Sequence, residues 1–223
     1  MTRSPGVSVV IPALNEESSL AAAIQSVADA DEIVVVDGGS SDGTVERAKS
    51  LGARVVMASA GRGAQMAEGA ALTVGEWIVF LHADTRLGAG ACAFIRSLGE
   101  DIVGGAFSLR FASPRPVFRV LEGAVSLRTR WLKLPYGDQA IFSRRASYHA
   151  AGGMPPLPIM EDVAFVRAMG RVGRLAFPKL EAETSVRRFE RKGPLLTATT
   201  NLLLLTRYFA GADIDELARA YRS

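Results

Sequence analysis

Residues 33–44 read Ile-Val-Val-Val-Asp-Gly-Gly-Ser-Ser-Asp-Gly-Thr, an apolar run that ends in the carboxylate of Asp37 and continues into a glycine-rich loop. Asp84 closes a second apolar run, and the pair Glu161-Asp162 follows a proline-rich stretch. A β-run that ends in a carboxylate indicates a parallel sheet with acidic groups along its carboxyl edge, where ligands bind in open α/β sheets. We therefore expect Asp37, Asp84 and Asp162 to surround a common cavity, in which a divalent metal holding a phosphate offsets their repulsion.

The first half of the chain alternates β-type apolar runs with helical patterns. The expected strands are 7–11, 33–37, 54–57 and 77–81, and the expected helices are 16–28, 44–51, 64–72 and 89–98. We expect Pro12 to end the first strand, because proline removes a ladder hydrogen bond. This alternation predicts an α/β fold in which helices cover both faces of a mostly parallel sheet.

The second half of the chain is less regular. One extended strand is expected over 104–111 and a short one over 139–143, with helices at 116–128 and 161–169, a leucine-rich helix from 193 onward and a last helix at 213–221. We expect one domain over residues 1–192 and a helical extension over 193–223.

The bulk composition is that of a folded protein with a sizeable core. The chain has 223 residues, of which 48% are hydrophobic and 22% charged, enough for one large α/β domain with a small extension. A net charge of +3 is too small to argue for nucleic acid. The single cysteine, Cys92, excludes an internal disulfide. We find no secretory peptide and no apolar run of about 18 residues, and we expect a cytoplasmic protein.

A basic cluster precedes the leucine-rich helix. It consists of Arg187, Arg188, Arg191 and Lys192. The cluster fits a solvated helix start, a phosphate site, or contact with the inner face of a membrane. Core packing or a homodimer formed through the C-terminal helices explains the same amphipathic pattern.

Two loops carry candidate nucleotide contacts. In the loop Pro12-Ala13-Leu14-Asn15-Glu16, we expect Asn15 to cap the following helix, and the open amides there could hold a base or phosphate. Asp37 can accept hydrogen bonds from a ribose or a base, and Gly38 lets the loop approach a flat ligand.

A third loop reads Gly-Arg-Gly-Ala-Gln over residues 61–65. It is neither a dinucleotide fingerprint, because Met66 takes the place of the third glycine, nor a phosphate-binding P-loop. Arg62 is our candidate here for contact with a base or phosphate, with Gln65 beside it.

His82 and Asp84 are candidate metal ligands. Alternate residues of an extended segment project to the same side, so an imidazole and a carboxylate would face one ion. This pair suits Mn²⁺ or Mg²⁺ when diphosphate oxygens complete the shell. A histidine on its own would more often be a structural residue.

Taken together, these motifs resemble family 2 glycosyltransferases. The likeness covers about residues 7–190 and rests on four motifs in the same order: 9–16, 36–44, the strand end at Asp84, and Glu161-Asp162. The runs Gly-Arg-Gly-Ala-Gln at 61–65 and His-Ala-Asp-Thr at 82–85 are similar to those of a small bacterial subgroup sometimes labelled arsenosugar-biosynthesis glycosyltransferases.

The resemblance implies a GT-A fold, a Rossmann-like three-layer sandwich, that carries out inverting transfer from a nucleotide-diphosphate sugar with a divalent metal, Mn²⁺ or Mg²⁺. UDP is the nucleotide it favours, and the acceptor is unidentified. It implies donor contacts at Pro12, Ala13, Asn15, Glu16, Asp37, Gly38, Arg62, Gln65 and Asp84.

Asp84 matches the last carboxylate of the family's D-x-D element, and His82 replaces the first. Asp162 matches the general base, which takes the acceptor proton during in-line displacement. Asp138, Gln139 and Glu161 are expected on the acceptor side. Taken alone, the Glu161-Asp162 pair would more simply be helix N-terminal charge.

Two other functions fit the same features. A nucleotidyltransferase also combines a parallel sheet, a glycine-rich loop and a carboxylate-held metal, but it would normally want a basic loop after the first strand. A non-catalytic sugar-nucleotide-binding protein would bind the donor without turnover.

Overall fold

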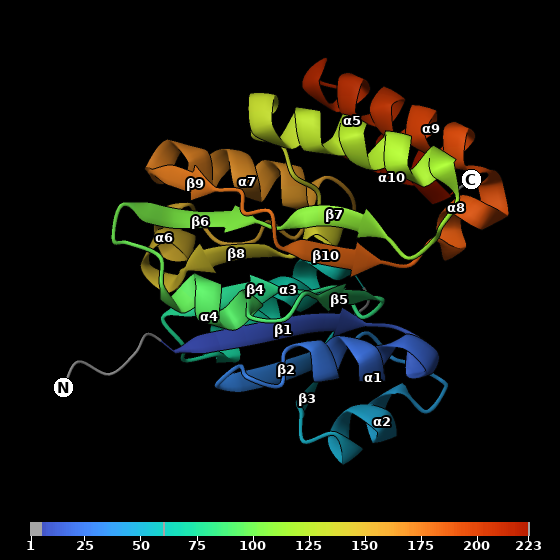
Figure 1. Ribbon diagram of the computed structural model, residues 1–223. Helices are drawn as coiled ribbons and strands as arrows, with labels where there is room; N and C mark the ends of the chain where they lie inside the picture. The colour runs from blue at the N-terminus through green and yellow to red at the C-terminus, as the bar shows by residue number, and fades with distance from the viewer. Residues whose placement is uncertain (1–5, 60, 223) are drawn as a thin grey trace.

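The computed structural model describes residues 6–59 and 61–222. A seven-stranded sheet forms its centre, with strand order β3-β2-β1-β4-β8-β6-β9. The strands are β1 (Val7–Ala13), β2 (Glu32–Asp37), β3 (Arg54–Met57), β4 (Trp77–Phe80), β6 (Ile102–Ala106), β8 (Ile141–Arg144) and β9 (Arg174–Ala176). Its pairings are parallel except for the two made by β8. The predicted mostly parallel α/β sheet is confirmed (Figure 1).

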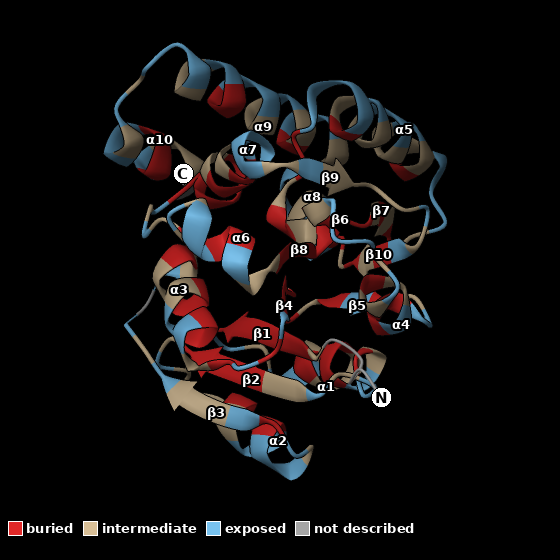
Figure 2. Ribbon diagram, turned by 90° about the vertical axis from the view of Figure 1, so that its left-hand side faces the viewer, coloured by how far each residue is buried: buried red, intermediate tan, exposed pale blue. Residues whose placement is uncertain are grey.

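Helices cover both faces of this sheet, which gives three layers. One apolar cluster joins alternate β1 residues such as Val9 to α1 (Glu17–Ser26), α2 (Thr44–Ser50) and α4 (Ala91–Arg96). A second joins Val10 and its neighbours to α3 (Arg62–Leu72), α6 (Arg145–Ala150) and α7 (Glu161–Val172). Strands β1 and β2 are buried between the layers (Figure 2). This burial explains why their sequences are continuously apolar.

Strand β1 runs two residues further than predicted. Pro12 pairs with Val36 and Ala13 with Asp37, so proline does not end the strand. The pairing of β1 with β4 stops at Val10. Pro12 therefore lies where the strand has one neighbour only, and its missing N–H costs no ladder bond on the other side.

The predicted strand over 104–111 is wrong, because the chain changes sheets at Phe107. Residues before it form β6 of the large sheet. Residues after it form β7 (Ser108–Phe111) of a three-stranded sheet with β10 (Glu181–Thr184) and β5 (Thr85–Leu87). Phe107 is fully buried and its N–H donates to the carbonyl of Gln139 (2.8 Å). An alternating pattern does not tell which sheet a strand joins.

The last part of the chain consists of α8 (Arg187–Lys192), α9 (Pro194–Phe209) and α10 (Ile214–Arg222), with α5 (Pro116–Leu132) lying beside α9 (Figure 1). Leu204, Leu205 and Leu217 share an apolar cluster with Ile159 and Val163. A division at residue 193 remains a prediction. Within the described residues, no helix is long and apolar enough to cross a membrane.

Candidate functional site

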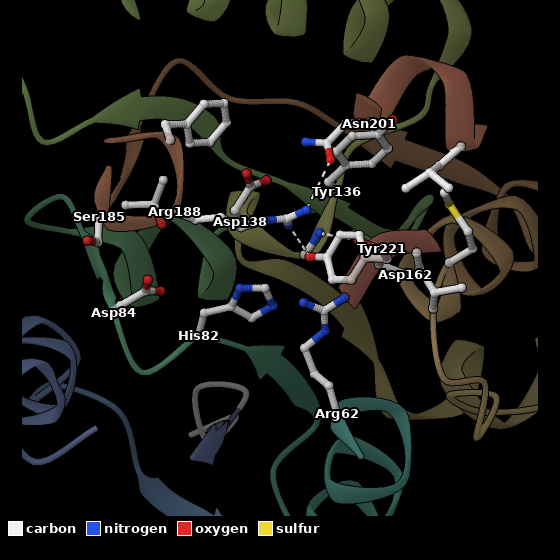
Figure 3. A pocket seen from close by; sticks show the side chains of 16 residues that line it. Arg62, His82, Asp84, Tyr136, Asp138, Asp162, Ser185, Arg188, Asn201 and Tyr221 are labelled. Atoms are coloured by element: carbon white, nitrogen blue, oxygen red, sulfur yellow. Dashed lines mark hydrogen bonds between the residues drawn. The ribbon is translucent and has the colours of Figure 1, made fainter. Parts of the chain in front are cut away.

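A polar cavity of about 210 Å³ lies at the carboxyl edge of the large sheet. Figure 3 shows Asp84 at one side of it and Asp162 at the other, with His82 and Asp138 between them. The full lining is Arg62, His82, Asp84, Tyr136, Gly137, Asp138, Ile159, Met160, Asp162, Thr184, Ser185, Arg188, Phe189, Asn201, Leu204 and Tyr221. Asp84 and Asp162, which are far apart in sequence, therefore meet in one cavity.

The sheet topology explains where the cavity forms. In the sheet, β1 lies between β2 and β4, so the chain builds the sheet outward from β1 first in one direction and then in the other. Where the direction changes, a crevice forms beyond the carboxyl ends of β1 and β4. His82 and Asp84 follow β4, where the chain turns at residues 83–84 instead of staying extended as predicted. The turn is closed by the Thr85 N–H donating to the carbonyl of His82 (3.0 Å). Both residues still line the same cavity.

Asp162 is fixed at the start of α7. Met160 precedes the helix in the left-handed conformation (φ 62°), a strained geometry for a residue with a side chain. The two oxygens of Asp162 each accept a backbone N–H, one from Gly137 and one from Val163, both at 2.7 Å. These two bonds hold the carboxylate in one orientation at the start of the helix.

Gly137 makes this arrangement possible. A Cβ at this position would lie 2.6 Å from Nε2 of His82 and 3.4 Å from Oδ2 of Asp162. Nε2 of His82 is buried and has no hydrogen-bond partner among the described residues. Burial, together with the nearby charge of Arg62, lowers the pKa of His82 to about 3, so its imidazole is neutral at pH 7.

We expect Gly137→Ala to destabilise the protein by about 1–3 kcal/mol, because the added methyl group overpacks His82. Urea unfolding would measure the change. Gly123→Ala is the matched control: it lies inside α5 with nothing within 4 Å of an added Cβ. The control is expected to gain about 0.5–1 kcal/mol, as alanine does over glycine inside helices. Equal effects at the two positions would contradict the close packing at Gly137.

Asp138 is a cavity carboxyl whose pKa lies well above its ordinary value. Burial raises its pKa to about 6, against a partly opposing effect of Arg128. Its Oδ1 is buried and has no hydrogen-bond partner among the described residues. A carboxyl with these properties can hold a proton near neutral pH and donate it to an acceptor hydroxyl oxygen.

The raised pKa of Asp138 predicts a pH-dependent stability. Between its ordinary value of 3.8 and about 6, the folded state binds more protons than the unfolded state, so stability falls as pH rises. We expect Asp138→Asn to reduce this loss, measured as the difference in Tm between pH 4 and pH 7. An unchanged difference would show that Asp138 is ionised throughout.

Glu161 lies beside Asp162 but turns to Arg62. Its carboxylate is 1% exposed and forms an ion pair with the guanidinium of Arg62. Burial raises the pKa of Glu161, and the charge of Arg62 opposes that rise. The ion pair links α3 to α7 next to the cavity, and the charge of Glu161 is offset by that of Arg62.

Asp84 and Glu16 both lie next to the guanidinium of Arg187. The Arg187 guanidinium lies 2.6 Å from Glu16 and 3.7 Å from Asp84. Burial and the nearby Glu16 charge raise the pKa of Asp84, whereas Arg187 lowers it. The hydrogen bond to Glu16 raises the pKa of Arg187. One of the basic residues next to the leucine-rich helix therefore offsets carboxylate repulsion at this edge of the sheet.

These residues fit a divalent metal held jointly with a diphosphate. The described residues contain no group of three or more histidine, cysteine, aspartate or glutamate side chains that could form a metal cage. Mg²⁺ is commonly held by one or two carboxylates together with substrate phosphates. Asp84 supplies such a carboxylate, and neutral His82 has a ring nitrogen without a partner.

Several predicted donor residues do not line this cavity. Asp37 is fully buried, and its carboxylate accepts the N–H groups of Gly39 and Ser40, each at 2.8 Å. Of the three carboxylates predicted to surround a common cavity, Asp84 and Asp162 line it and Asp37 does not. Asn15 is not the helix cap, because Glu16 occupies that position. The Asn15 Oδ1 instead accepts the Ser41 N–H (2.8 Å) and links two loops.

Buried amides account for two further candidates. Gln65 donates to the carbonyls of Ala13 (2.9 Å) and Val36 (2.8 Å) and thereby ties β1 to β2. Its side chain lies 3.1 Å from where a Cβ of Gly38 would be. Gln139 donates to the carbonyl of Phe107 (2.9 Å) and is 1% exposed. It is therefore a buried structural residue next to Asp138. Pro12 and Ala13 are buried in β1.

The C-terminal helices supply cavity residues that the sequence did not single out as a group. Arg188 stacks on the ring of Tyr221 at 3.8 Å and donates to Oδ1 of Asn201 (3.4 Å). Tyr136 stacks with Arg128 at 3.5 Å. The basic cluster was the sequence signal for Arg188, but it did not distinguish the roles of Arg187 and Arg188 from those of Arg191 and Lys192.

Comparisons with known proteins identify the family. The family model described as Glycosyl transferase family 2 matches residues 8–150. The chain belongs to this family. A PGL/p-HBAD biosynthesis glycosyltransferase of Mycobacterium bovis is 33% identical over 169 residues, which cover 67% of this chain and 63% of the relative. Glucosyl-3-phosphoglycerate synthase of Mycobacterium tuberculosis is 37% identical over 92 residues, which cover 35% of this chain and 28% of the relative.

Solved structures of that synthase share the fold of this family 2 chain. A complex with Mn²⁺, UDP and glucosyl-3-phosphoglycerate aligns with a TM-score of 0.60 and 25% identity, covering 89% of this chain and 79% of that chain. A complex with Mg²⁺ and UDP aligns with a TM-score of 0.56 and 26% identity, covering 81% of this chain and 70% of that chain. The predicted GT-A fold is confirmed.

Proposed function

We propose that this protein is an inverting, metal-dependent glycosyltransferase that moves a sugar from a nucleotide-diphosphate sugar to an acceptor hydroxyl. The observation that carries the proposal is the placement of Asp84 and Asp162 at different sides of one small cavity (Figure 3). Inversion needs a single in-line displacement, with the leaving group and the base on opposite sides of the anomeric carbon. The family membership favours glycosyl transfer over nucleotidyl transfer and over binding alone.

The proposed roles follow from the contacts of each residue. Asp162 takes the acceptor proton, because its carboxylate is fixed by two backbone N–H groups and lines the cavity. The acceptor oxygen then bonds to the anomeric carbon as the bond to the diphosphate oxygen breaks, and the nucleoside diphosphate leaves. A divalent metal bound beside Asp84, with His82 as a further candidate ligand, would neutralise charge on the departing diphosphate.

The donor is proposed to be a UDP-sugar. Solved relatives hold UDP with Mn²⁺ or Mg²⁺, and Arg62, Arg187 and Arg188 gather positive charge around the same edge. The loops at Pro12-Ala13, Asn15-Glu16 and Asp37-Gly38, together with Gln65, would border the nucleoside. Asp138 and Glu161 would lie on the acceptor side, with Gln139 supporting them. We also propose that the chain belongs to the arsenosugar-labelled subgroup, without assigning its substrate.

A thermal-shift screen followed by product analysis tests the function. We expect UDP-sugars with Mn²⁺ or Mg²⁺ to raise Tm by ligand linkage, and EDTA to remove the rise. With a suitable acceptor, the expected product is UDP and not pyrophosphate. Pyrophosphate released from a nucleoside triphosphate would show a nucleotidyltransferase, and binding without any turnover would indicate a sensor. No shift with any nucleotide sugar would contradict the proposal.

We propose a cytoplasmic location with peripheral contact at the inner membrane face, made by α5 and α9. Trp131, Leu132, Leu195 and Leu196 are all more than 60% exposed on these helices, and basic residues of α8 adjoin them. This combination suits interfacial binding. Co-sedimentation with anionic vesicles tests it. A homodimer in solution that does not bind vesicles would assign the surface to self-association.

A further inference from the structure

An apolar groove lies next to the polar cavity, between α5 and α9. Its volume is about 820 Å³, within the range of ligand sites in proteins. Leu109 and Phe111 of β7 line it together with side chains of the two helices, among them Ala198 and Leu202. The groove is thus a second, larger space next to the candidate site.

The groove and the cavity adjoin each other. Tyr136, Asp138, Phe189 and Asn201 line both of them. One molecule can therefore occupy both spaces, with one end beside Asp138 and the other between the helices. The shared residues include the polar ones, so the polar end of such a molecule belongs in the cavity.

The groove itself offers a ligand almost no free polar group. Apart from the shared residues and the indole N–H of Trp131, the polar side chains among the described residues that line it are Arg128 and Thr199. Arg128 donates to the carbonyl of Leu134 (2.9 Å) and stacks on Tyr136. The hydroxyl of Thr199 donates to the carbonyls of Leu195 and Leu196, both at 3.0 Å. A segment bound here gains by burying apolar surface and not by hydrogen bonding.

We propose that this groove binds the aliphatic tail of an amphiphilic acceptor whose hydroxyl-bearing head lies in the polar cavity. The proposal rests on the proposed function, because it takes the cavity to be the place where the acceptor hydroxyl reacts. The adjacency of the two spaces selects this occupant: its inner end has to be polar and small, and its outer end long and apolar. The groove thereby assigns the class of acceptor, an alcohol or glycoside carrying a long hydrocarbon chain.

Binding of n-alkyl β-D-glucosides tests the tail site without nucleotide or metal. Methyl, hexyl, octyl and decyl glucosides would be titrated below their micelle concentrations. We expect affinity to rise roughly fourfold for each methylene group buried. Trp131 lines the groove and is 78% exposed, whereas Trp77, the other tryptophan, is fully buried. A blue shift of Trp131 emission that disappears in Trp131→Phe would report the binding.

Two adjacent leucines provide a matched control. Leu202 and Leu203 are 60% and 59% exposed, and of the two only Leu202 lines the groove. We expect Leu202→Ser to weaken decyl glucoside binding about tenfold and Leu203→Ser to leave it within about twofold. Ala198→Phe, which fills the groove, should abolish the dependence on chain length. Thr206→Phe on the exposed side of α9 should not.

Three results would overturn the tail site. The first is an affinity that does not depend on chain length. The second is an equal loss in the two leucine variants, which would place the alkyl chain on the outer face of α9. The third is a dimer that dissociates in Ala198→Phe while alkyl glucosides fail to bind, which would make the groove an interface between copies. Titration of UDP with Mn²⁺ is separate, so failure of the proposed function would appear there alone.

Discussion

Asp162→Asn is expected to lower the rate of sugar transfer by about 100- to 10,000-fold while leaving UDP affinity nearly unchanged. The amide keeps the shape of the side chain but cannot take the acceptor proton. Asp162 accepts the N–H groups of Gly137 and Val163, both at 2.7 Å, and the single oxygen of the amide can keep one of these two contacts. Turnover would be measured as UDP release in the presence of acceptor, and binding by calorimetry with UDP and Mn²⁺.

The control has to separate loss of a base from loss of structure. In Asp162→Ala, added formate should restore part of the activity if the missing group is a proton acceptor, because a small carboxylate can enter the vacated space. Urea unfolding of both variants would measure any structural damage. Near-normal turnover in Asp162→Asn, or no formate effect together with lost UDP binding, would refute the assignment of Asp162 as the base.

Asp84→Ala is expected to reduce metal-dependent UDP affinity on the order of 100-fold, because a metal contributes several kcal/mol of charge stabilisation. Without metal, UDP affinity should stay the same or rise, since removing Asp84 leaves Arg187 with Glu16 alone. Calorimetry with Mn²⁺ and with EDTA would measure both effects. Asp101→Ala is the matched control, because Asp101 pairs with Arg174 and does not line the cavity. Equal losses with and without metal would remove Asp84 from the metal site.

The meeting of Asp84 and Asp162 could be predicted from sequence. Asp84 follows β4, and the carboxyl ends of neighbouring parallel strands lie at one edge of the sheet. Asp162 lies at the start of α7 and not at a strand end, so its place was predicted from the family motif. The absence of Asp37 from the cavity lining could not be predicted in this way. Its carboxylate accepts hydrogen bonds from N–H groups of its own loop, which the spacing of residues does not indicate. Gln65 is a similar case, since hydrogen bonds to main-chain carbonyls leave no trace in residue spacing.

The cavity residues of the C-terminal helices show a different limit of prediction from sequence. Arg188, Asn201 and Tyr221 reach the cavity through the packing of α8, α9 and α10. Helix periodicity states which face is apolar, but not which other helix covers it or what lies at the end of the interface. The apolar groove is also a product of packing between α5 and α9 and could not be inferred from either helix alone.

The bridge from Arg187 to Glu16 and Asp84 bears on how this enzyme could be re-engineered. The residues proposed to hold the donor precede position 85, except for Arg187 and Arg188, whereas those proposed to receive the acceptor and its tail come from position 109 onward. Chimaeras that exchange the later part of the chain between family members could therefore redirect the product while keeping the sugar. Such a graft has to retain an arginine at position 187, or the two carboxylates that it inherits from the parent will lose their counter-ion.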